Sequence, residues 1–273
     1  MKSLNTTEQD SRYSDLDKMS VEELLQGMNQ EDQSVPRAMA ESLKEVKAVV
    51  EALVPRMREG GRVFYLGAGT SGRLGIVDAS EIPPTFGVRG KFIGLIAGGD
   101  CAIRDAVEGA EDDWEQGWKD ILRFSPTKND SLIGITASGG APYVRGAILK
   151  AREHGLFTSC ITCNEGAPIA SEVDIPIVTV VGPEFLTGST RLKAGTCAKL
   201  TLNMISTATM ILLGHVRGCK MVDMQLSNKK LVDRGTRMIM TETGIEEYQT
   251  ARDLLLKYGH VRDAVDAFLI KKQ

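Results

Sequence analysis

The chain has 273 residues, of which 42% are hydrophobic, and it carries 36 Asp and Glu against 33 Lys and Arg. A formal net charge of −3 and an aromatic content of 5% offer neither a basic nor a base-stacking surface, so nucleic acid is excluded as an expected partner. The most apolar long stretch, residues 200–213, is too short and too polar to span a bilayer, so no membrane association is expected either.

The N-terminal part of the chain is expected to be helical. Residues 1–20 are polar and lack the apolar stretch of a secretory signal. A capping box formed by Ser20 and Glu23 opens a short helix through about residue 29. A second helix is predicted over 35–59, where apolar residues recur at three- and four-residue steps. This stripe could serve either as core or as a dimer interface.

From residue 62 onward the pattern alternates between strands and helices. Strands are predicted over 62–66, 91–96, 131–136, 157–162 and 175–181, and helices up to 80 and over 112–124, 142–154 and 189–215. This alternation implies parallel β-α-β units with helices on both faces of the sheet. We therefore expect an α/β fold, a three-layer α-β-α sandwich of the flavodoxin-like type with a mostly parallel sheet. Ligands in such sheets bind at the carboxyl ends of the strands.

The C-terminal part reads differently. Helical patterns cover 228–240, 246–258 and 262–270, without intervening strands. We expect a main domain over 1–225, including the N-terminal helices, and a small helical C-terminal region over 226–273.

A glycine-rich loop follows the first expected strand and matches the pattern G-x-G-x-x-G over residues 67–72. In a dinucleotide site, an acid after the second strand would bind the ribose, and Asp100 is the candidate, at a spacing longer than usual. In a phosphate site, backbone N–H groups and hydroxyls at the helix N-terminus would bind a phosphate monoester. We favour the phosphate site over the dinucleotide site and over a merely tight β-α turn. The candidates are Gly69, Thr70, Ser71 and Gly72.

Two further loops carry hydroxyls at strand ends or helix starts. One contains Ser138 and Gly139 and precedes the helix at Pro142, and the other contains Ser189 and Thr190, with Lys193 following one turn later. Each alone could be only a helix cap. Three such loops in one chain favour a sugar-phosphate site.

Two glutamates are candidates for proton transfer. Glu81 stands where Pro83 and Pro84 are expected to end a helix, and Glu111 precedes a helix with Asp112 as part of its cap. Both could equally be solvated acids at helix ends. The three histidines fall away from these loops and form no ligand cluster, so we expect neither a metal nor another cofactor. The five cysteines show no disulfide framework, and we expect a cytoplasmic protein.

Taken together, these segments resemble the sugar isomerase (SIS) superfamily and, within it, the N-acetylmuramic acid 6-phosphate etherases. The resemblance runs from about residue 7 to the C-terminal region. It rests on residues 67–75, 78–81, 83–87, 96–99, 107–112, 182–184 and 186–196. One departure lies in the second loop, where Gly140 and Ala141 stand in place of the family's usual arginine and threonine.

The resemblance implies cleavage of the D-lactyl ether at C3 of the sugar, which gives N-acetylglucosamine 6-phosphate and D-lactate in cell-wall sugar recycling. It implies Glu81 as the acid at the ether oxygen, Glu111 as the base at C2, and Glu184 among the substrate-binding residues. One of the two catalytic carboxylates is expected to be partly desolvated. The resemblance also implies a homodimer with sites near its interface. An aldose–ketose isomerase and a non-catalytic sugar-phosphate sensor are the alternatives, and an NAD enzyme is the weakest one.

Overall fold

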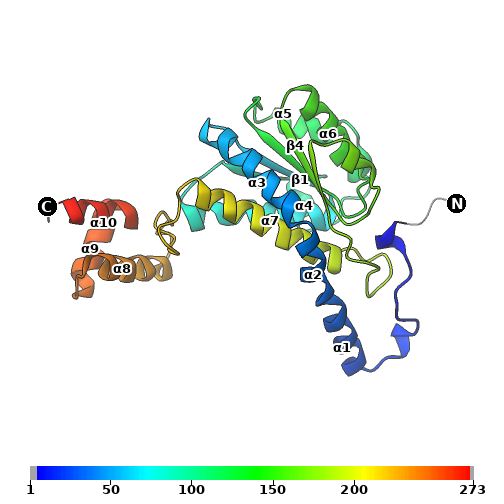
Figure 1. Cartoon of the computed structure of the whole chain (residues 1–273), viewed down its shortest axis with the longest axis horizontal. Coiled ribbons are helices and arrows are strands. Elements are labelled where there is room, and N and C mark those ends of the chain that lie inside the picture. Colours follow the sequence, from blue (N-terminus) through cyan, green and yellow to red (C-terminus); the bar gives the residue numbers. More distant parts are fainter. Residues whose placement is uncertain (1–4, 271–273) are drawn as a thin grey trace. The chain divides into compact units, whose positions relative to one another are not determined.

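The computed structural model describes residues 5–270, which separate into two compact units (Figure 1). The first takes the described residues up to Ser80 together with Lys91–Ser206, and the second takes Glu81–Gly90 together with the residues from Thr207 on. Helices α4 (Gly69–Phe86) and α7 (Lys193–Leu212) contribute residues to both. The domain boundary expected at residue 225 is not tested by this division and stays a prediction.

A five-stranded sheet forms the centre of the first unit, and all its strand pairs are parallel. The strands are β1 (Val63–Gly67), β2 (Phe92–Ile96), β3 (Ser131–Ile135), β4 (Phe157–Thr162) and β5 (Ile175–Val178), in the order β2-β1-β3-β4-β5. In this register Gly67 pairs with both Ile96 and Ile135, so the carboxyl ends of the three strands lie side by side. The α/β fold with a parallel sheet is confirmed.

Helices cover both faces of this sheet (Figure 1). Because side chains alternate along a strand, Phe64 and Leu132 point to one face, where they share a core with α5 (Gln116–Leu122) and α6 (Pro142–Glu153). Tyr65 points to the other face, where its Cβ would lie 3.0 Å from a Cβ at Gly75 of α4. Helix α3 (Leu43–Arg58) contacts β5. The expected three-layer α-β-α arrangement is therefore present.

The N-terminal helices differ from expectation at one point. The capping box that opens α1 (Val21–Asp32) is confirmed, with Ser20 and Glu23 bonded reciprocally. The single helix predicted over 35–59 is wrong, because the chain forms α2 (Ser34–Glu41) and α3 with a break at Ser42. The Ser42 hydroxyl is buried and donates to the carbonyl of Val178, 2.9 Å away, at the end of β5. The helical pattern is thus interrupted at Ser42, the residue whose hydroxyl makes a tertiary hydrogen bond.

Most of the apolar stripe along α2 and α3 is buried inside the chain. Val35, Met39 and Leu53 are at most 1% exposed, whereas Leu43 remains 48% exposed. Of the two alternatives that the sequence leaves open, core or dimer interface, the stripe therefore serves mainly as core.

The prediction that α4 ends before its two prolines is wrong. The helix continues through Pro83 and Pro84 to Phe86, and the N–H of Gly87 donates to the carbonyl of Pro83 at 2.9 Å. Ile82 and Phe86 are both buried, so the packing of this last turn outweighs the backbone hydrogen bonds that proline cannot donate. The chain leaves the helix at Gly87, whose φ of +73° suits glycine.

The cap predicted for the helix after residue 112 is also wrong. Residues 110–112 form a separate turn of 3₁₀ helix, and α5 starts only at Gln116. The side chain of Asp113 accepts hydrogen bonds from the N–H groups of Glu115 and Gln116, both at 3.0 Å. Asp113, rather than Asp112, therefore caps this segment.

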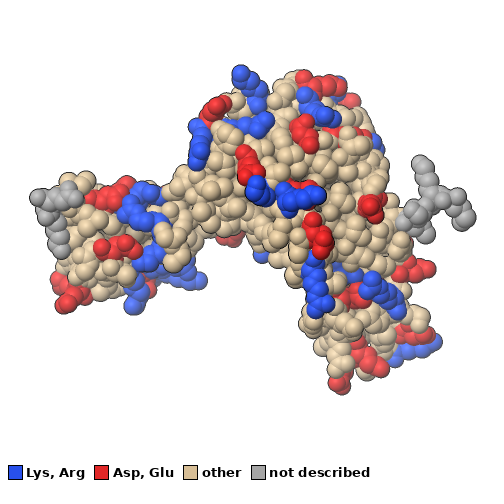
Figure 2. Space-filling model, viewed as in Figure 1, with Lys and Arg blue, Asp and Glu red and all other residues tan. Residues whose placement is uncertain are grey.

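The three expected C-terminal helices are present in the second unit as α8 (Lys229–Thr243), α9 (Tyr248–Tyr258) and α10 (Val261–Ile270). They enclose a core of their own around Ile239, Leu255 and Val265. Within residues 5–270, no helix has both the length and the apolarity that a bilayer crossing requires. On the face of the first unit seen in Figure 2, positive and negative side chains are interspersed.

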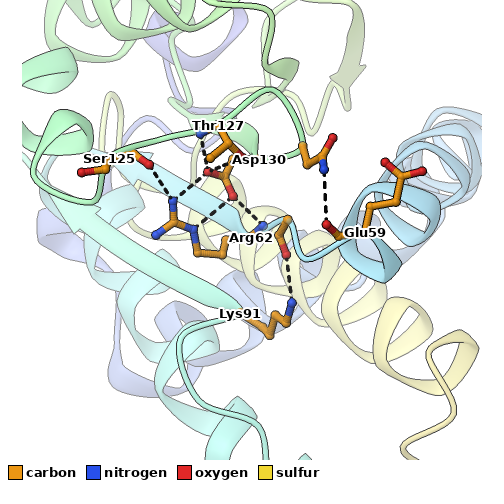
Figure 3. A network of polar contacts seen from close by, with 8 residues as sticks. Glu59, Arg62, Lys91, Ser125, Thr127 and Asp130 are labelled. Carbon is orange, nitrogen blue, oxygen red and sulfur yellow. Dashed lines mark hydrogen bonds and ion pairs between the residues drawn. The ribbon is translucent and has the colours of Figure 1, made fainter.

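The amino ends of β1 and β3 are joined by an ion pair between Arg62 and Asp130 (Figure 3). Asp130 accepts from the guanidinium and from the backbone N–H of Arg62, both at 2.7 Å, and from the N–H of Thr127 at 2.8 Å. Burial alone raises the pKa of Asp130, but these hydrogen bonds and the Arg62 charge together lower that pKa below its usual value. The pair fixes the edge of the sheet that lies opposite the strands' carboxyl ends.

Candidate active site

A cavity of about 400 Å³ opens at the carboxyl ends of β1 and β3. Its walls come from five parts of the chain besides β3 itself: the loop after β1, the loop after β3, the turn at residues 111–112, and single residues from two more distant segments. The lining residues are Glu8, 68–71, 111–112, 135–138, 140–142 and Thr190. Parallel topology brings these loops together, as expected of a site at this edge of a sheet.

The structure brings six of the candidate site residues to this cavity and leaves six elsewhere. The six that line it are Gly69, Thr70, Ser71, Glu111, Ser138 and Thr190. The six that do not are Gly72, Glu81, Gly139, Glu184, Ser189 and Lys193. Asp100, the candidate for a dinucleotide site, does not line it either.

The first loop turns directly into the N-terminus of α4. Gly69 has a φ of +52°, a conformation that glycine adopts without strain. Thr70 and Ser71 lie in the first turn of the helix, where N–H groups lack helical acceptors and can bind an anion. Gly72 lies behind them, since a Cβ there would be 2.6 Å from Cγ1 of Ile96. It allows the helix to approach the sheet instead of contacting a ligand.

The second loop is held in place by its own hydrogen bonds. The N–H of Gly139 donates to Oγ1 of Thr136 at 3.2 Å, and the N–H of Gly140 donates to Oγ of Ser138 at 3.2 Å. Gly139 has a φ of +73°, and a Cβ there would lie 2.3 Å from Cβ of Ala167. Only glycine fits that position, so Gly139 shapes the loop that presents Ser138 to the cavity.

The third loop is positioned by two buried charges. Glu184 accepts hydrogen bonds from the N–H groups of Lys193 and Ala194, at 2.8 and 3.0 Å, and so caps α7. Burial raises the pKa of Glu184, even though these two N–H groups act in the opposite direction. The Lys193 ammonium is 1% exposed and pairs with Glu31 of α1. These side chains are thus occupied by the fold, while Thr190 reaches the cavity.

The two candidate catalytic glutamates lie in different units. Glu111 lines the cavity from the first unit, next to Asp112. Glu81 belongs to the second unit and lies inside α4, before its last turn, and not at the end of the helix as the prolines suggested. Both side chains are exposed in this chain. The partial desolvation expected of one of them is therefore absent from the single chain.

Glu8 is a cavity residue that we did not predict from the sequence. It lies on an N-terminal segment that is tied to the domain on both sides of it. Thr7 is bonded to Asn164, and the N–H of Ser11 donates to Oγ1 of Thr187 at 2.9 Å. Residues 1–20 are polar and show no pattern that predicts a contact with the cavity. The one signal in the sequence is that the family resemblance begins near residue 7.

The cavity is acidic, since its lining includes the carboxylates of Glu8, Glu111 and Asp112 but no Lys or Arg. A phosphate could be bound here only through hydrogen bonds from backbone N–H groups and hydroxyls, which the three loops supply. The carboxylates are suited to accepting hydrogen bonds from sugar hydroxyls or to moving a proton.

Comparison with known proteins gives consistent results. The family model of the glucokinase regulatory protein N-terminal SIS domain matches residues 45–152. An N-acetylmuramic acid 6-phosphate etherase of Bacteroides fragilis is 55% identical over 97% of this chain and 94% of its own length. The etherase of Porphyromonas gingivalis is 54% identical over 96% and 95%. The solved structure of phosphoheptose isomerase from Neisseria gonorrhoeae has a TM-score of 0.51, at 17% identity, and covers 68% of this chain and 97% of that one.

Proposed function

The chain belongs to the N-acetylmuramic acid 6-phosphate etherases of the SIS superfamily, and from this premise we propose that it cleaves the D-lactyl ether at C3 of that sugar phosphate. It is then a carbon–oxygen lyase whose products are N-acetylglucosamine 6-phosphate and D-lactate. The observation that carries the proposal is the juxtaposition of Glu111 with hydroxyl-bearing loops in one cavity, in a chain 55% identical to such an enzyme. Recycling of cell-wall sugar in the cytoplasm is the corresponding biological setting, and the five free thiols fit a reducing compartment.

The phosphate is bound at the N-terminus of α4 by the N–H groups and hydroxyls of Thr70 and Ser71, with Ser138 and Thr190 facing it from the other loops. Glycines at 69, 72 and 139 allow this backbone geometry. Glu184, Ser189 and Lys193 act indirectly, because they hold the loop that carries Thr190. The positive potential of the helix N-terminus offsets part of the repulsion from the cavity's carboxylates.

The reaction is an elimination followed by a hydration; each half needs two proton transfers, and neither needs a redox step. Ring opening exposes an aldehyde at C1, which acidifies the proton at C2. Glu111 removes that proton, the C3–O bond breaks, and Glu81 protonates the departing lactate oxygen. Glu81 then takes a proton from water, which adds at C3, and a proton returns to C2. Because both carboxylates are exposed in the single chain, we expect bound substrate or a second copy of the chain to supply their desolvation.

A homodimer accordingly forms part of the proposal. Exposed apolar side chains on α1, Val21 at 72% and Leu25 at 62%, are available for such a contact, whereas most of the α2–α3 stripe is buried. Light scattering at micromolar concentration should give twice the mass of 29.6 kDa. A monomeric mass would remove this part of the proposal.

The direct test is enzymatic release of D-lactate from N-acetylmuramic acid 6-phosphate. The wild-type chain should release lactate and incorporate one solvent hydrogen at C2, while Glu81→Gln and Glu111→Gln should lower kcat by at least about 100-fold. The neighbouring Asp112→Asn serves as the matched control for a lost cavity charge. Interconversion of hexose 6-phosphates without lactate release would identify an isomerase, and binding without turnover would identify a sensor.

A further inference from the structure

A second cavity of about 360 Å³ adjoins the first one. Ala68, Gly69 and Glu111 line both cavities, so Glu111 stands on the wall that they share. The rest of the second cavity is formed by Arg73 of α4, Ala97, Ala102 and residues 106–110. All of these residues belong to the first unit.

Arg73 is the one Lys or Arg among the lining residues of the two cavities. Its Nε donates to the carbonyl of Ile103 at 2.9 Å and its Nη2 donates to the carbonyl of Asp105 at 3.5 Å. These bonds hold the guanidinium against the segment 103–105, whereas Nη1 has no hydrogen-bond acceptor among residues 5–270. A positioned guanidinium with a remaining donor is suited to binding a carboxylate.

The substrate of the proposed reaction carries two anionic groups. The phosphate at C6 is matched by amides and hydroxyls in the first cavity, but the lactyl carboxylate on the C3 oxygen finds no cation there. C2 and C3 are adjacent carbons of the sugar. When Glu111, on the wall between the two cavities, contacts the proton at C2, the substituent on C3 lies next to the second cavity. That space is the second cavity, which contains Arg73.

We propose that the second cavity is the lactyl subsite and that Arg73 binds the lactyl carboxylate of the substrate. This inference rests on the proposed function. The subsite also contains Glu108 and Glu111, which would repel an anion, so the Arg73 charge is required for a carboxylate to bind. Arg73 therefore makes the enzyme select ethers that carry an acid over neutral ethers of the same size.

The experiment compares two substrates, the natural lactyl acid and its neutral lactamide analogue, in three proteins. The wild type should prefer the acid by about 10- to 100-fold in kcat/KM, the gain expected of a charge-assisted hydrogen bond. Arg73→Gln should lose most of that preference, mainly through a higher KM for the acid, while Arg73→Lys should retain part of it. Arg104→Gln removes an exposed charge from the same loop outside both cavities, so it should behave as wild type.

Affinity for N-acetylglucosamine 6-phosphate, which lacks the lactyl group, separates this role from support of the loop. It should change less than about 2-fold in Arg73→Gln. An equal loss for acid, amide and the lactyl-free sugar would overturn the inference in favour of a structural Arg73. Equal kcat/KM values of the wild type for the acid and the amide would also overturn the inference, whatever the variants show. If the wild type releases no lactate from either substrate, the proposed function itself has failed.

Discussion

Thr7 and Asn164 bind each other through two hydrogen bonds across 157 positions of sequence. The N–H of Thr7 donates to Oδ1 of Asn164 at 3.1 Å, and Nδ2 of Asn164 donates to Oγ1 of Thr7 at 2.9 Å. Both residues are fully buried, and Asn164 also donates to the carbonyl of Ala137 in the loop after β3. One asparagine therefore connects the segment that carries Glu8 to the loop that carries Ser138.

Asn164→Ala should remove the hydrogen bonds that join the N-terminal segment to the loop after β3. The buried N–H and hydroxyl of Thr7 would lose their partner, while the Ala137 carbonyl keeps the N–H of Cys163 and the hydroxyl of Thr162. We therefore expect a loss of about 1–3 kcal/mol in the free energy of unfolding. Since Glu8 and Ser138 would both be less well positioned, KM should rise more than kcat falls. Urea unfolding and steady-state kinetics measure the two effects. Asn129→Ala, which removes a single hydrogen bond to the Glu59 carbonyl, is the matched control, and equal effects of the two variants would contradict a role in the cavity.

Glu8→Gln should change the cavity's charge without changing its shape. A carboxylate about 8 Å from a phosphate dianion opposes its binding by roughly 1 kcal/mol in water-like surroundings. Inorganic phosphate should therefore inhibit Glu8→Gln at a concentration about 2- to 5-fold lower than it inhibits the wild type. The difference should shrink as salt is added, because salt screens exposed charges. Asp10→Asn, on the same segment but outside the cavity lining, should show neither effect.

The site could be predicted from the sequence where local pattern decided it. A strand followed by glycine and hydroxyl residues and then by a helix predicts a loop at the carboxyl end of a strand, and parallel topology brings such loops together. This pattern predicts Thr70, Ser71, Ser138 and Thr190 as site residues, and all four line the cavity. The family resemblance then separated Glu111 from the many other acids of the chain.

Long-range partners limited the rest of the prediction. Lys193 looked like a phosphate ligand, yet its ammonium pairs with Glu31, 162 positions away, and no local pattern reveals that contact. Ser42 interrupts a helix because of a carbonyl at the end of β5, and α4 passes its prolines because Phe86 is buried. In each case tertiary contacts override the local preference of the chain.

Lys193→Met should destabilise the protein without acting through the phosphate. The ammonium is 1% exposed and the Glu31 side chain 7%, so the variant leaves a buried carboxylate facing an apolar group, with only Arg12 at 3.5 Å as a remaining cation. Breaking a buried pair in this way costs about 3–5 kcal/mol. The double variant Glu31→Leu with Lys193→Met should recover part of this loss in urea unfolding. If the double variant stays as unstable as Lys193→Met and both lose phosphate affinity, Lys193 binds the ligand after all.

Asp130→Asn tests the amino ends of β1 and β3, away from the cavity, and should affect stability but not catalysis. At pH 7 the variant weakens the bonds from Arg62 and Thr127 to a buried carboxylate, and we expect a loss of about 2–3 kcal/mol in the free energy of unfolding. The folded-state pKa of Asp130 is lowered, so its stabilising contribution is present above the unfolded pKa and disappears as the pH falls through the folded value. The difference between wild type and variant should therefore narrow below about pH 4.

Urea unfolding at pH 7 and pH 3 measures the effect of Asp130→Asn. The matched control is Asp15→Asn, which removes a carboxylate from an exposed pair with Lys18 and should leave stability nearly unchanged at both pH values. Because Asp130 lies at the amino ends of the strands, kcat and KM for the muramic acid substrate should be the same as in the wild type at 25 °C. A pH-independent loss of stability would mean that the shape of the side chain, and not its charge, holds β1 and β3 together at this edge.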